Sequence, residues 1–483
     1  MTPTKEQESI ISANLKPGDV LKIVAYAGTG KTSTLELLAR AIQVRDPKAK
    51  ILYLAFNKSV AVEAKGRFPS NVVASTIHSI AYKKEAGPYK HKLEGDIRAR
   101  LVAQALGVDV SLVKAGLEVM KAFLSSASKT ISTAHVPELL PKNVSPSDAL
   151  LWGQRIWEYM CEASSETVPM IHDGYLKLFH LKASDLGYQY IFLDEAQDSN
   201  PVTTDIVMSQ SQAVKVLVGD PHQQIYSWRG AENAMEKIQC QHAYYLTNSF
   251  RFGQKVAYIA NLILMYYKKE NRPVLGLRGE GEVGFIDSSK PYTVLGRTNS
   301  GIFEEALRLQ SLGIKIAVVG GAEALKVDQL KDAYRLFTKQ NDYLKDDYMK
   351  TFVDFEDLEQ YGKDYEDPEA KNLCKVIRKH PKDFHTLVQQ LVSSLVEEKD
   401  AQVILSTAHK AKGLEWDQVK LLDDYIKLFD EQGELLHPRY HPVDEINLMY
   451  VAVTRAQKCL QINESIRTAI LKIKLEYTKK NVS

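Results

Sequence analysis

The 483-residue sequence has few cysteines and no long hydrophobic run. Its four cysteines are scattered and form no CxxC pair: Cys161, Cys240, Cys374 and Cys459. This spacing argues against a zinc ribbon, an iron–sulfur cluster or a disulfide framework, and it indicates a reducing compartment. The longest nearly apolar stretch, residues 256–267, is interrupted by Asn261 and is too short to span a bilayer. We therefore expect a soluble protein that contacts no membrane.

The sequence also lacks a large excess of charge of one sign. Lys and Arg total 62 and Asp and Glu total 60, which gives a formal net charge of +2. Passive nucleic-acid-binding proteins are usually strongly basic, so any nucleic-acid site here must be a local groove. The first ten residues are polar and of mixed charge, so we expect no signal peptide. The protein is then cytoplasmic in a bacterial or phage-type host, or nuclear in a eukaryote.

A glycine-rich run at residues 25–32 (AYAGTGKT) predicts a phosphate-binding loop. A buried strand is expected before it, over 20–25, and a helix after it, over 32–41. Glycines let the backbone bend so that N–H groups and the helix N-terminus face an anion. Lys31 should reach the outer phosphates and the Thr32 hydroxyl should ligate Mg²⁺. The strict consensus has Gly where this chain has Ala25. The predicted phosphate-binding residues are Ala27, Gly28, Thr29, Gly30, Lys31 and Thr32.

A second run, residues 194–198 (DEAQD), follows a predicted buried strand over 190–194. A carboxylate at the carboxyl end of a central strand lies beside the phosphate loop in such folds. We expect Asp194 to hold Mg²⁺, and Glu195 to orient and deprotonate the attacking water. Together the two runs predict the binding and hydrolysis of a nucleoside triphosphate.

Strand-like runs alternate with helical stretches in two successive sets. The first set covers residues 20–25, 51–56, 72–75, 190–194 and 214–218, and the second covers 293–296, 314–319, 402–406 and 418–422 before a final helix over about 444–457. This rhythm predicts an α/β fold with two parallel-sheet lobes, each carrying a mainly helical insertion. The predicted boundaries are 1–86 and 181–243 for the first lobe, 87–180 for its insertion, 244–320 and 398–483 for the second lobe, and 321–397 for its insertion.

Polar loops follow two strands of the first set. Asn57 and Lys58 come after the second strand, and Thr76 and His78 come after the third. Side chains at the carboxyl edge of a parallel sheet suit contact with a phosphodiester backbone. Each loop taken alone is equally compatible with an ordinary polar connection.

The segment 218–230 (VGDPHQQIYSWRG) gives a more specific signal. It begins as a buried strand and places Gln223 where it could sense the γ-phosphate. Tyr226, Trp228 and Arg229 follow closely, and aromatic rings interleaved with arginine form a stacking platform for unpaired bases. A core tryptophan beside a chance arginine is the alternative.

The second lobe carries three further candidate groups. Arg251 and Arg455 could stabilise charge that develops on a transferred phosphoryl group, although an exposed arginine at a helix end is the alternative for either. Within residues 406–416 (STAHKAKGLEW), Glu415 could accept a hydrogen bond from a ribose hydroxyl. The residues of this run that could meet phosphates are Thr407, His409 and Lys410.

This ordered set resembles the motifs of the UvrD/Rep/PcrA-type superfamily 1 DNA helicases. Residues 4–7 (TKEQ) resemble the adenine-reading motif, with Gln7 as the reader. Residues 25–32, including Ala25, resemble the first motif, and residues 194–198 resemble the second.

The later motifs follow in the same order. Residues 223–230 resemble the third motif, in which the family's glutamine couples ATP to DNA and its tryptophan stacks on a base. Phe250 and Arg251 fall where the family has an adenine-stacking aromatic residue and a γ-phosphate-binding arginine. Residues 409–416 and 450–455 resemble the fifth and sixth motifs.

The sequence resembles the helicase core of the F-box DNA helicase family more closely still. The runs that carry this likeness are AFNKSVAVEAKGRFP, HDGYLKL, GDPHQQIYSWRGA, LTNSFRFG and STAHKAKGLEWDQV. Because the sequence begins at the adenine-binding motif, we expect no F-box before the core, and a role in ubiquitin ligation is unsupported. The second insertion is much shorter than the corresponding domain of the larger bacterial helicases.

The resemblance implies two RecA-like lobes and a monomeric, ATP- and Mg²⁺-dependent DNA helicase. It implies 3′→5′ movement on single-stranded DNA, unwinding of tailed duplexes, and a role in DNA repair or recombination. Recombinases and single-strand-binding proteins are candidate partners. Three alternatives stay open: a translocase that strips proteins such as recombinase filaments with little unwinding, a nucleotide-gated DNA-binding scaffold, and a generic kinase or GTPase.

Overall fold

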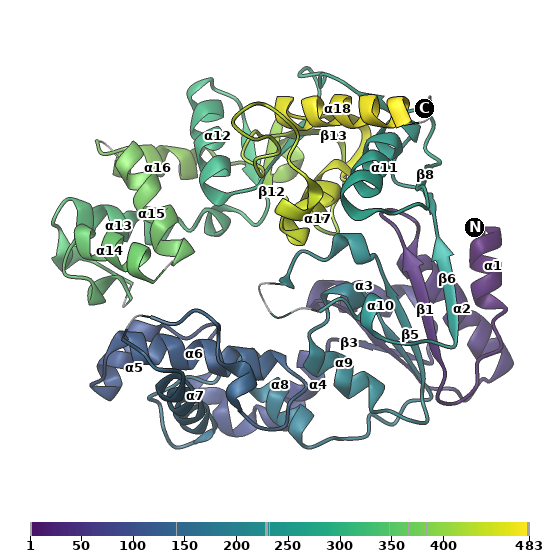
Figure 1. Cartoon of the computed structure of the whole chain (residues 1–483), viewed down its shortest axis with the longest axis horizontal. Coiled ribbons are helices and arrows are strands. Elements are labelled where there is room, and N and C mark those ends of the chain that lie inside the picture. The colour runs from purple at the N-terminus through teal and green to yellow at the C-terminus, as the bar shows by residue number, and fades with distance from the viewer. Residues whose placement is uncertain are drawn as a thin grey trace. The chain divides into compact units, whose positions relative to one another are not determined.

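The structure is a computed structural model that describes residues 2–141, 143–227, 230, 232–346, 348–365, 367–382 and 384–480. The chain divides into two compact units, residues 1–246 and 247–483, and Figure 1 labels many of their helices and strands. Among the described residues, no helix is both long and apolar enough to cross a membrane.

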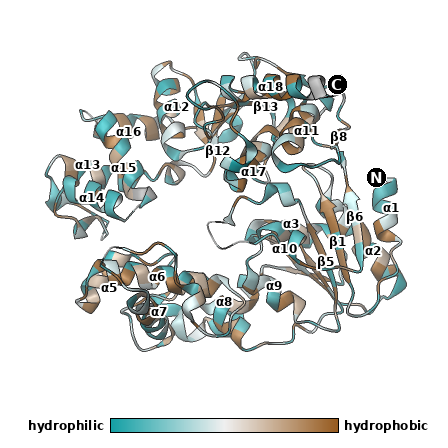
Figure 2. Cartoon of the chain, viewed as in Figure 1, coloured by the Kyte–Doolittle hydropathy of each residue, from teal (hydrophilic) through white to brown (hydrophobic). Residues whose placement is uncertain are grey.

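The first unit is built on a six-stranded sheet in which every paired strand is parallel, in the order β3-β2-β4-β5-β1-β6. Its strands are β1 Val20–Ala25, β2 Ile51–Leu54, β3 Val72–Ser75, β4 Tyr190–Leu193, β5 Val214–Gly219 and β6 His242–Leu246. The central strands are nearly continuous apolar runs, as expected for a parallel sheet covered on both faces. Figure 2 shows this apolar colouring along β1 and β5.

Helices cover both faces of this sheet, and the strands' alternating side chains belong to two separate cores. Ile51 and Tyr53 pack in the core beneath α1 Lys5–Ile11, α2 Lys31–Arg45 and α3 Lys58–Arg67. Leu52 and Leu54 pack in the core beneath α4 Ile77–Glu85, α9 Pro201–Met208 and α10 Ala234–Lys237. Because every pairing in the sheet is parallel, the carboxyl ends of all its strands lie at one edge.

Residues 87–180 of this unit are mainly helical. They include α5 Ala99–Leu106, α6 Val110–Ser125, α7 Pro146–Cys161 and most of α8 His172–Leu181. The helices α6 and α7 approach closely at Gly116 and Gly153, where an added Cβ would lie 2.7 Å from Trp152 Cβ and 2.5 Å from Val119 Cγ1. The core of this region is continuous with the core under α4 and α9.

The second unit contains another six-stranded parallel sheet, in the order β11-β12-β10-β13-β14-β9, and a short two-stranded parallel sheet. The larger sheet consists of β9 Glu282–Val283, β10 Tyr292–Gly296, β11 Ile316–Val318, β12 Val403–Thr407, β13 Trp416–Leu421 and β14 Ala456–Gln461. The smaller sheet joins β7 Asn248–Ser249 to β8 Leu275–Gly276.

Helices of the second unit fall into two groups. Those that pack around the sheet are α11 Gln254–Lys268, α12 Asn299–Ser311, α17 Val443–Val453 and α18 Glu464–Lys480. Residues 321–397 hold the others: α13 Val327–Phe337, α14 Phe355–Asp364, α15 Pro368–Lys379 and α16 Phe384–Ser394.

The predicted α/β class with two parallel sheets, consistent with two RecA-like lobes, is confirmed. Two details of the prediction are wrong. The final helix expected over 444–457 ends at Val453, and both β14 and α18 follow it. The predicted boundary at 243/244 falls inside β6, which pairs with β1 from Leu21↔His242 to Ala25↔Leu246. The strands β6 and β14 both contain polar residues and are only partly buried, so neither has the apolar run that marks the central strands.

Candidate functional site

The glycine-rich run forms the turn between β1 and α2. Gly28 and Gly30 have φ angles of 74° and 81°, which lie in the left-handed region that favours glycine. The Thr29 hydroxyl donates a 2.8 Å hydrogen bond to the Tyr26 carbonyl and closes the turn. Gly30 is the N-cap residue of α2, and Lys31 and Thr32 begin the helix. The N-terminus of a 15-residue helix therefore faces the turn, as an anion site requires.

Lys31 is held beside the two acidic residues that follow β4. Its Nζ lies 2.6 Å from Oε1 of Glu195. The Tyr53 hydroxyl donates a 2.5 Å hydrogen bond to Asp194 Oδ2, and the Glu195 backbone N–H donates a 2.9 Å bond to Asp194 Oδ1. Glu195 itself has a φ of 50°. A non-glycine residue in this conformation is strained and is often found at a functional site.

The electrostatics of this group favour a cation. Burial, together with the charge of Glu195, raises the pKa of Asp194 above its ordinary value. Burial alone would lower the pKa of Lys31, but the nearby charges of Glu195, Asp194 and Asp220 outweigh it and raise that pKa. Adjacent carboxylates next to a phosphate loop offer the oxygen ligands that Mg²⁺ prefers.

The donor set also fits the way Mg²⁺ is usually bound. No group of three or more His, Cys, Asp or Glu side chains with metal-binding geometry occurs within the part of the chain that the structure describes. Magnesium ions at phosphoryl-transfer sites take one or two protein ligands and complete their shell with substrate phosphates and water. Asp194 and Thr32 match that pattern.

Two residues that the sequence did not single out connect the second run to the third. The Gln197 carboxamide donates to Glu195 Oε2 at 2.5 Å and to Asp198 Oδ2 at 3.0 Å, and its Oε1 accepts from the Asp220 N–H at 3.1 Å. Asp220 in turn accepts a 2.6 Å hydrogen bond from Gln223 Nε2. Glu195 and Gln223 are thus linked through Gln197 and Asp220, both of which are buried.

Gln7 lies against the start of the phosphate-loop helix. Its side chain forms a reciprocal capping box with Thr4, and its Nε2 donates a 2.9 Å hydrogen bond to Thr34 Oγ1. The Thr34 hydroxyl donates to the Gly30 carbonyl at 2.9 Å. A glutamine amide keeps one more N–H and one more oxygen lone pair for a ligand. This geometry holds a potential base-reading group next to the phosphate loop.

Three of the residues expected to contact nucleic acid, Asn57, Lys58 and Thr76, follow strands β2 and β3 at the same edge of the first sheet. Asn57 caps α3 by accepting from the Val60 N–H at 2.9 Å, and Thr76 caps α4 by accepting from the Ser79 N–H at 3.0 Å. Both side chains therefore have a local structural role, and they place helix N-termini where phosphates could bind. Lys58 is exposed in the first turn of α3.

An aromatic pair and a histidine lie near these helix ends. Phe56 is 44% exposed and its ring stacks on Tyr226, with centroids 5.7 Å apart and an interplanar angle of 15°. His78 Nε2 lies 3.0 Å from Asp173 Oδ1 on α8. Phe56 was not among the predicted contacts, although its position directly before Asn57 in an aromatic-containing loop was a usable signal. Trp228 and Arg229 lie outside the described residues.

The predicted residues of the second unit form their own cluster. Arg251 Nε donates a 2.6 Å bond to Glu415 Oε2, and Gln457 Nε2 donates a 2.6 Å bond to Glu415 Oε1. Burial would raise the pKa of Glu415, but Arg251 and Gln457 outweigh it and lower that pKa. Phe250, beside Arg251, is 44% exposed. Glu415 was expected to accept a ribose hydroxyl, and here its carboxylate accepts from Arg251 and Gln457.

Arg455 is one of the largest fully buried side chains among the described residues. Its guanidinium donates to the Val451 carbonyl at 2.9 Å, to the Leu414 carbonyl at 3.2 Å and to Thr454 Oγ1 at 3.1 Å. The alternative of a solvent-exposed arginine is therefore wrong for Arg455, because the carbonyls of Val451 and Leu414 and the Thr454 hydroxyl surround its guanidinium.

The loop after β12 holds the remaining candidates. Thr407 ends the strand, and its Oγ1 accepts from the Lys410 N–H at 3.4 Å. Lys410 Nζ donates to the Ala324 carbonyl at 3.3 Å, and burial, with the nearby charge of Lys326, lowers its pKa. His409 lies between them and is partly exposed.

Comparisons with known proteins match both units. Residues 7–229 match the AAA domain model, and residues 326–465 match the UvrD-like helicase C-terminal domain model. The chain is 34% identical to F-box DNA helicase 1 of Gallus gallus over 96% of this chain and 49% of that protein. It is 32% identical to F-box DNA helicase protein 1 of Schizosaccharomyces pombe, over 96% of this chain and 57% of that protein.

A bacterial relative is more distant. The probable DNA helicase II homolog of Mycoplasma genitalium is 24% identical over 62% of this chain and 58% of that protein. The chain thus spans between 49% and 58% of the length of these relatives. The two domain matches fall on the two units and include most of the residues described above. By these matches and by its fold, the chain belongs to the UvrD-like helicase family.

Proposed function

We propose that the chain is an ATP- and Mg²⁺-dependent DNA helicase that moves 3′→5′ on single-stranded DNA. The observation that carries the proposal is the buried link from Glu195 through Gln197 and Asp220 to Gln223. It joins the groups suited to ATP hydrolysis to the segment that contains Tyr226, Trp228 and Arg229. A nucleotide-dependent change at Glu195 can therefore reach the strand-binding segment through four consecutive hydrogen-bonding groups.

In this proposal, the backbone N–H groups of residues 27–32 and the Lys31 ammonium bind the phosphates of ATP. Thr32 and Asp194 hold Mg²⁺, which supplies charge neutralisation on the phosphate oxygens when it is bound. Glu195 accepts a proton from the attacking water, and Gln7 and Phe250 recognise the adenine. Arg251 and Arg455 contribute positive charge to the transferred phosphoryl group, and Glu415 binds the ribose.

Single-stranded DNA would bind along the loops of both units. The residues proposed for the first unit are Asn57, Lys58, Thr76, His78, Tyr226, Trp228 and Arg229, and those for the second are Thr407, His409 and Lys410. Stacking of one base on an aromatic ring contributes about 1–3 kcal/mol and is independent of sequence. The stacked pair of exposed Phe56 and partly buried Tyr226 offers such a surface.

The test combines ATPase turnover, with and without single-stranded DNA, and strand displacement on duplexes with a 3′ or a 5′ tail. We expect DNA to stimulate turnover and displacement to require a 3′ tail, ATP and Mg²⁺. Displacement only from a 5′ tail would overturn the polarity and leave the ATPase assignment intact. Binding of DNA without turnover would favour a nucleotide-gated scaffold instead.

DNA-stimulated turnover without displacement from either tail would favour the second candidate, a translocase that removes bound proteins. That outcome can be checked directly by adding a recombinase filament on single-stranded DNA and measuring its ATP-dependent loss. Monomeric behaviour on DNA, and roles in repair or recombination, belong to the same proposal.

A further inference from the structure

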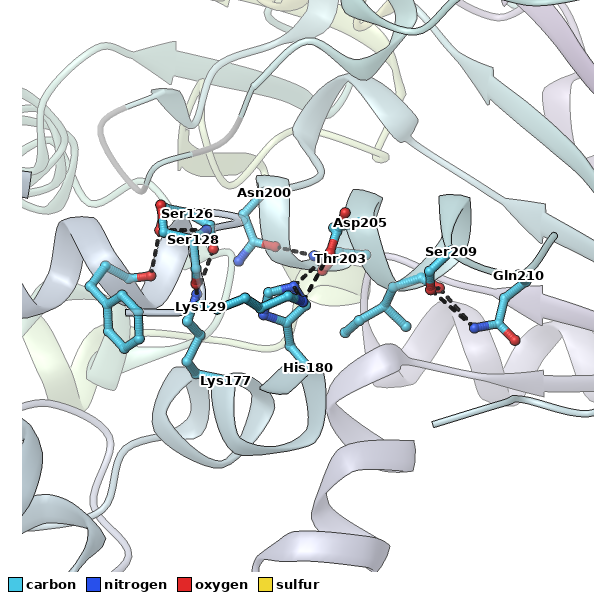
Figure 3. Close-up of polar contacts among 12 residues, drawn as sticks. Ser126, Ser128, Lys129, Lys177, His180, Asn200, Thr203, Asp205, Ser209 and Gln210 are labelled. Carbon is cyan, nitrogen blue, oxygen red and sulfur yellow. Dashed lines mark hydrogen bonds and ion pairs between the residues drawn. The ribbon is translucent and has the colours of Figure 1, made fainter. Parts of the chain in front are cut away.

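A buried lysine in the helical region of the first unit lies away from the nucleotide-binding groups. Lys177 on α8 is 0% exposed. Its Nζ donates to the Ser126 carbonyl at 2.7 Å and to the Ser128 carbonyl at 2.6 Å, and it lies 4.1 Å from the centre of the Phe123 ring. Figure 3 shows Lys177 reaching this turn from the helix below it. An ammonium group buried this deeply needs hydrogen-bond partners, because its desolvation is costly.

The turn that Lys177 binds is the end of α6. Ser126 is the C-cap residue of that helix, and its hydroxyl is 3.1 Å from His135 Nε2 and accepts from the Ser128 N–H at 3.2 Å. Carbonyl groups at a helix C-terminus carry partial negative charge, so a cation placed there is favourable. Lys177 therefore fixes where α6 ends and how the chain leaves it.

The last residue of α6 touches the end of the third motif. Gly230 has a φ of 75°, and a Cβ added to it would lie 2.5 Å from Ser125 Cβ and 2.6 Å from Ser125 Oγ. The Gly230 backbone is thus packed directly on the Ser125 side chain. Gly230 follows Trp228 and Arg229 in sequence by one or two residues.

Other contacts hold the same segment to the end of the second motif. The Ile225 N–H donates to Asp198 Oδ1 at 3.4 Å, and the Glu232 N–H donates to the Ser199 carbonyl at 3.1 Å. Beyond Ser199, the helix α9 is joined to α8 because Asp205 Oδ2 lies 2.7 Å from His180 Nε2 and 3.3 Å from Lys129 Nζ. Figure 3 shows His180 and Lys129 meeting at Asp205.

We propose that Lys177 is a positioning residue for single-strand binding. By holding the turn at Ser126–Ser128, it keeps Ser125 against Gly230 and so fixes one end of the segment that begins at Ile225 and includes Tyr226. The proposal rests on the proposed function, since it assumes that this segment binds DNA. Lys177 contacts neither the phosphate loop nor the carboxylates, so its role lies in DNA affinity rather than in hydrolysis.

The chain offers a matched control in the same helical region. Lys92 is also buried, and its Nζ donates to the carbonyls of Tyr159, Glu162 and Ser165 at 3.0, 2.7 and 2.7 Å. It caps the end of α7 as Lys177 caps the end of α6. The Lys92 contacts do not include Ser125 or Gly230, so Lys92→Met removes a similar cap without the proposed link.

The experiment measures ATPase turnover of the full chain against the concentration of a single-stranded oligonucleotide. Lys177→Met should raise the half-saturating DNA concentration about 2- to 30-fold, the range for a residue that acts through neighbouring contacts. Turnover without DNA should stay within about 2-fold of the wild type, a split that indicates lost binding rather than lost chemistry. Lys92→Met should leave the half-saturating DNA concentration unchanged.

Equal effects of Lys92→Met and Lys177→Met on DNA affinity, or equal losses of basal and stimulated turnover in Lys177→Met, would overturn the proposal. If Lys177→Met yields no folded protein, Gly230→Ala tests the same contact from the other side. It should raise the half-saturating DNA concentration, and Ser125→Gly should partly reverse that rise because it removes the atoms that the new methyl group meets. A wild-type protein without DNA stimulation would refute the proposed function itself, which separates the two failures.

Discussion

Lys31 and Lys177 are two largely buried lysines of the first unit, and their surroundings shift the pKa in opposite directions. Lys31 faces carboxylates, whose charges outweigh its burial and raise its pKa. Lys177 faces neutral backbone carbonyls, so burial, with the charge of Lys129, lowers its pKa to about 8 despite the attraction of Asp205. The partner of a buried cation therefore decides whether it stays firmly charged.

This difference in pKa fits the different roles proposed for the two lysines. A lysine proposed to bind a polyphosphate needs a permanent charge, and the carboxylates beside Lys31 favour its charged form. A lysine that only caps a helix needs donors in fixed positions, and carbonyl partners suffice. The comparison separates a lysine suited to chemistry from one suited to shape.

The largest expected effect is a loss of ATP turnover when Lys31 or its partner Glu195 is replaced. Lys31→Ala or Glu195→Gln should lower ATP turnover by about 10²-fold or more, because each removes a charge or a base from the reaction. Steady-state ATPase assays at saturating ATP would measure it. Glu195→Gln should still bind ATP and DNA, and Glu8→Gln, an exposed position on α1, should turn over normally. Near-normal turnover in Glu195→Gln would remove Glu195 from its assigned role.

A smaller effect is expected from the network beside Lys31. A Cβ on Gly219 would lie 2.2 Å from Gln197 Oε1, so Gly219→Ala should displace the carboxamide that joins Glu195 to Asp220. Overpacking of this kind costs about 1–3 kcal/mol of stability, measurable by urea unfolding. DNA stimulation of turnover should fall as well.

Gly66→Ala on α3 is the matched control for Gly219→Ala. No atom lies within 4 Å of the Cβ that it would add, and alanine is the better helix former. We expect Gly66→Ala to be neutral or slightly stabilising. Equal stability of the two variants would show that the carboxamide of Gln197 moves aside without cost.

The smallest expected effect is a pH dependence of the contribution that Lys177 makes to the free energy of unfolding. The pKa of Lys177 is about 8 in the folded protein, and its ordinary value is 10.5. Between pH 8 and pH 10.5, Lys177 is therefore mostly deprotonated in the folded protein and mostly protonated in the unfolded chain. Stability from this group therefore rises with pH across that window. The difference in unfolding free energy between the wild type and Lys177→Met should shift in favour of the wild type from pH 8 to pH 10. A constant difference would show that the Lys177 pKa is not lowered.

The glycine-rich turn and the central strands of the first sheet could be predicted because their determinants are local. Gly28 and Gly30 are required by a turn of a few residues, and the central strands are marked by their own apolar runs. The strands β6 and β14 were missed because their composition is mixed, and their place in the sheets depends on their pairing with β1 and β13. The end of the first unit was misplaced by three residues for the same reason, since β6 continues to Leu246.

The sequence by itself determined the parallel α/β architecture and the glycine-rich turn before α2, and it singled out Asp194 and Glu195 as the acidic pair beside that turn, because each is marked by a short run of residues. Only the tertiary structure revealed Tyr53 on Asp194, the link through Gln197 and Asp220, and the support of Gly230 by Ser125 and Lys177. These contacts join residues as far as 141 positions apart. No local pattern encodes such a contact, because it forms only when the strands and helices that carry both partners have packed together.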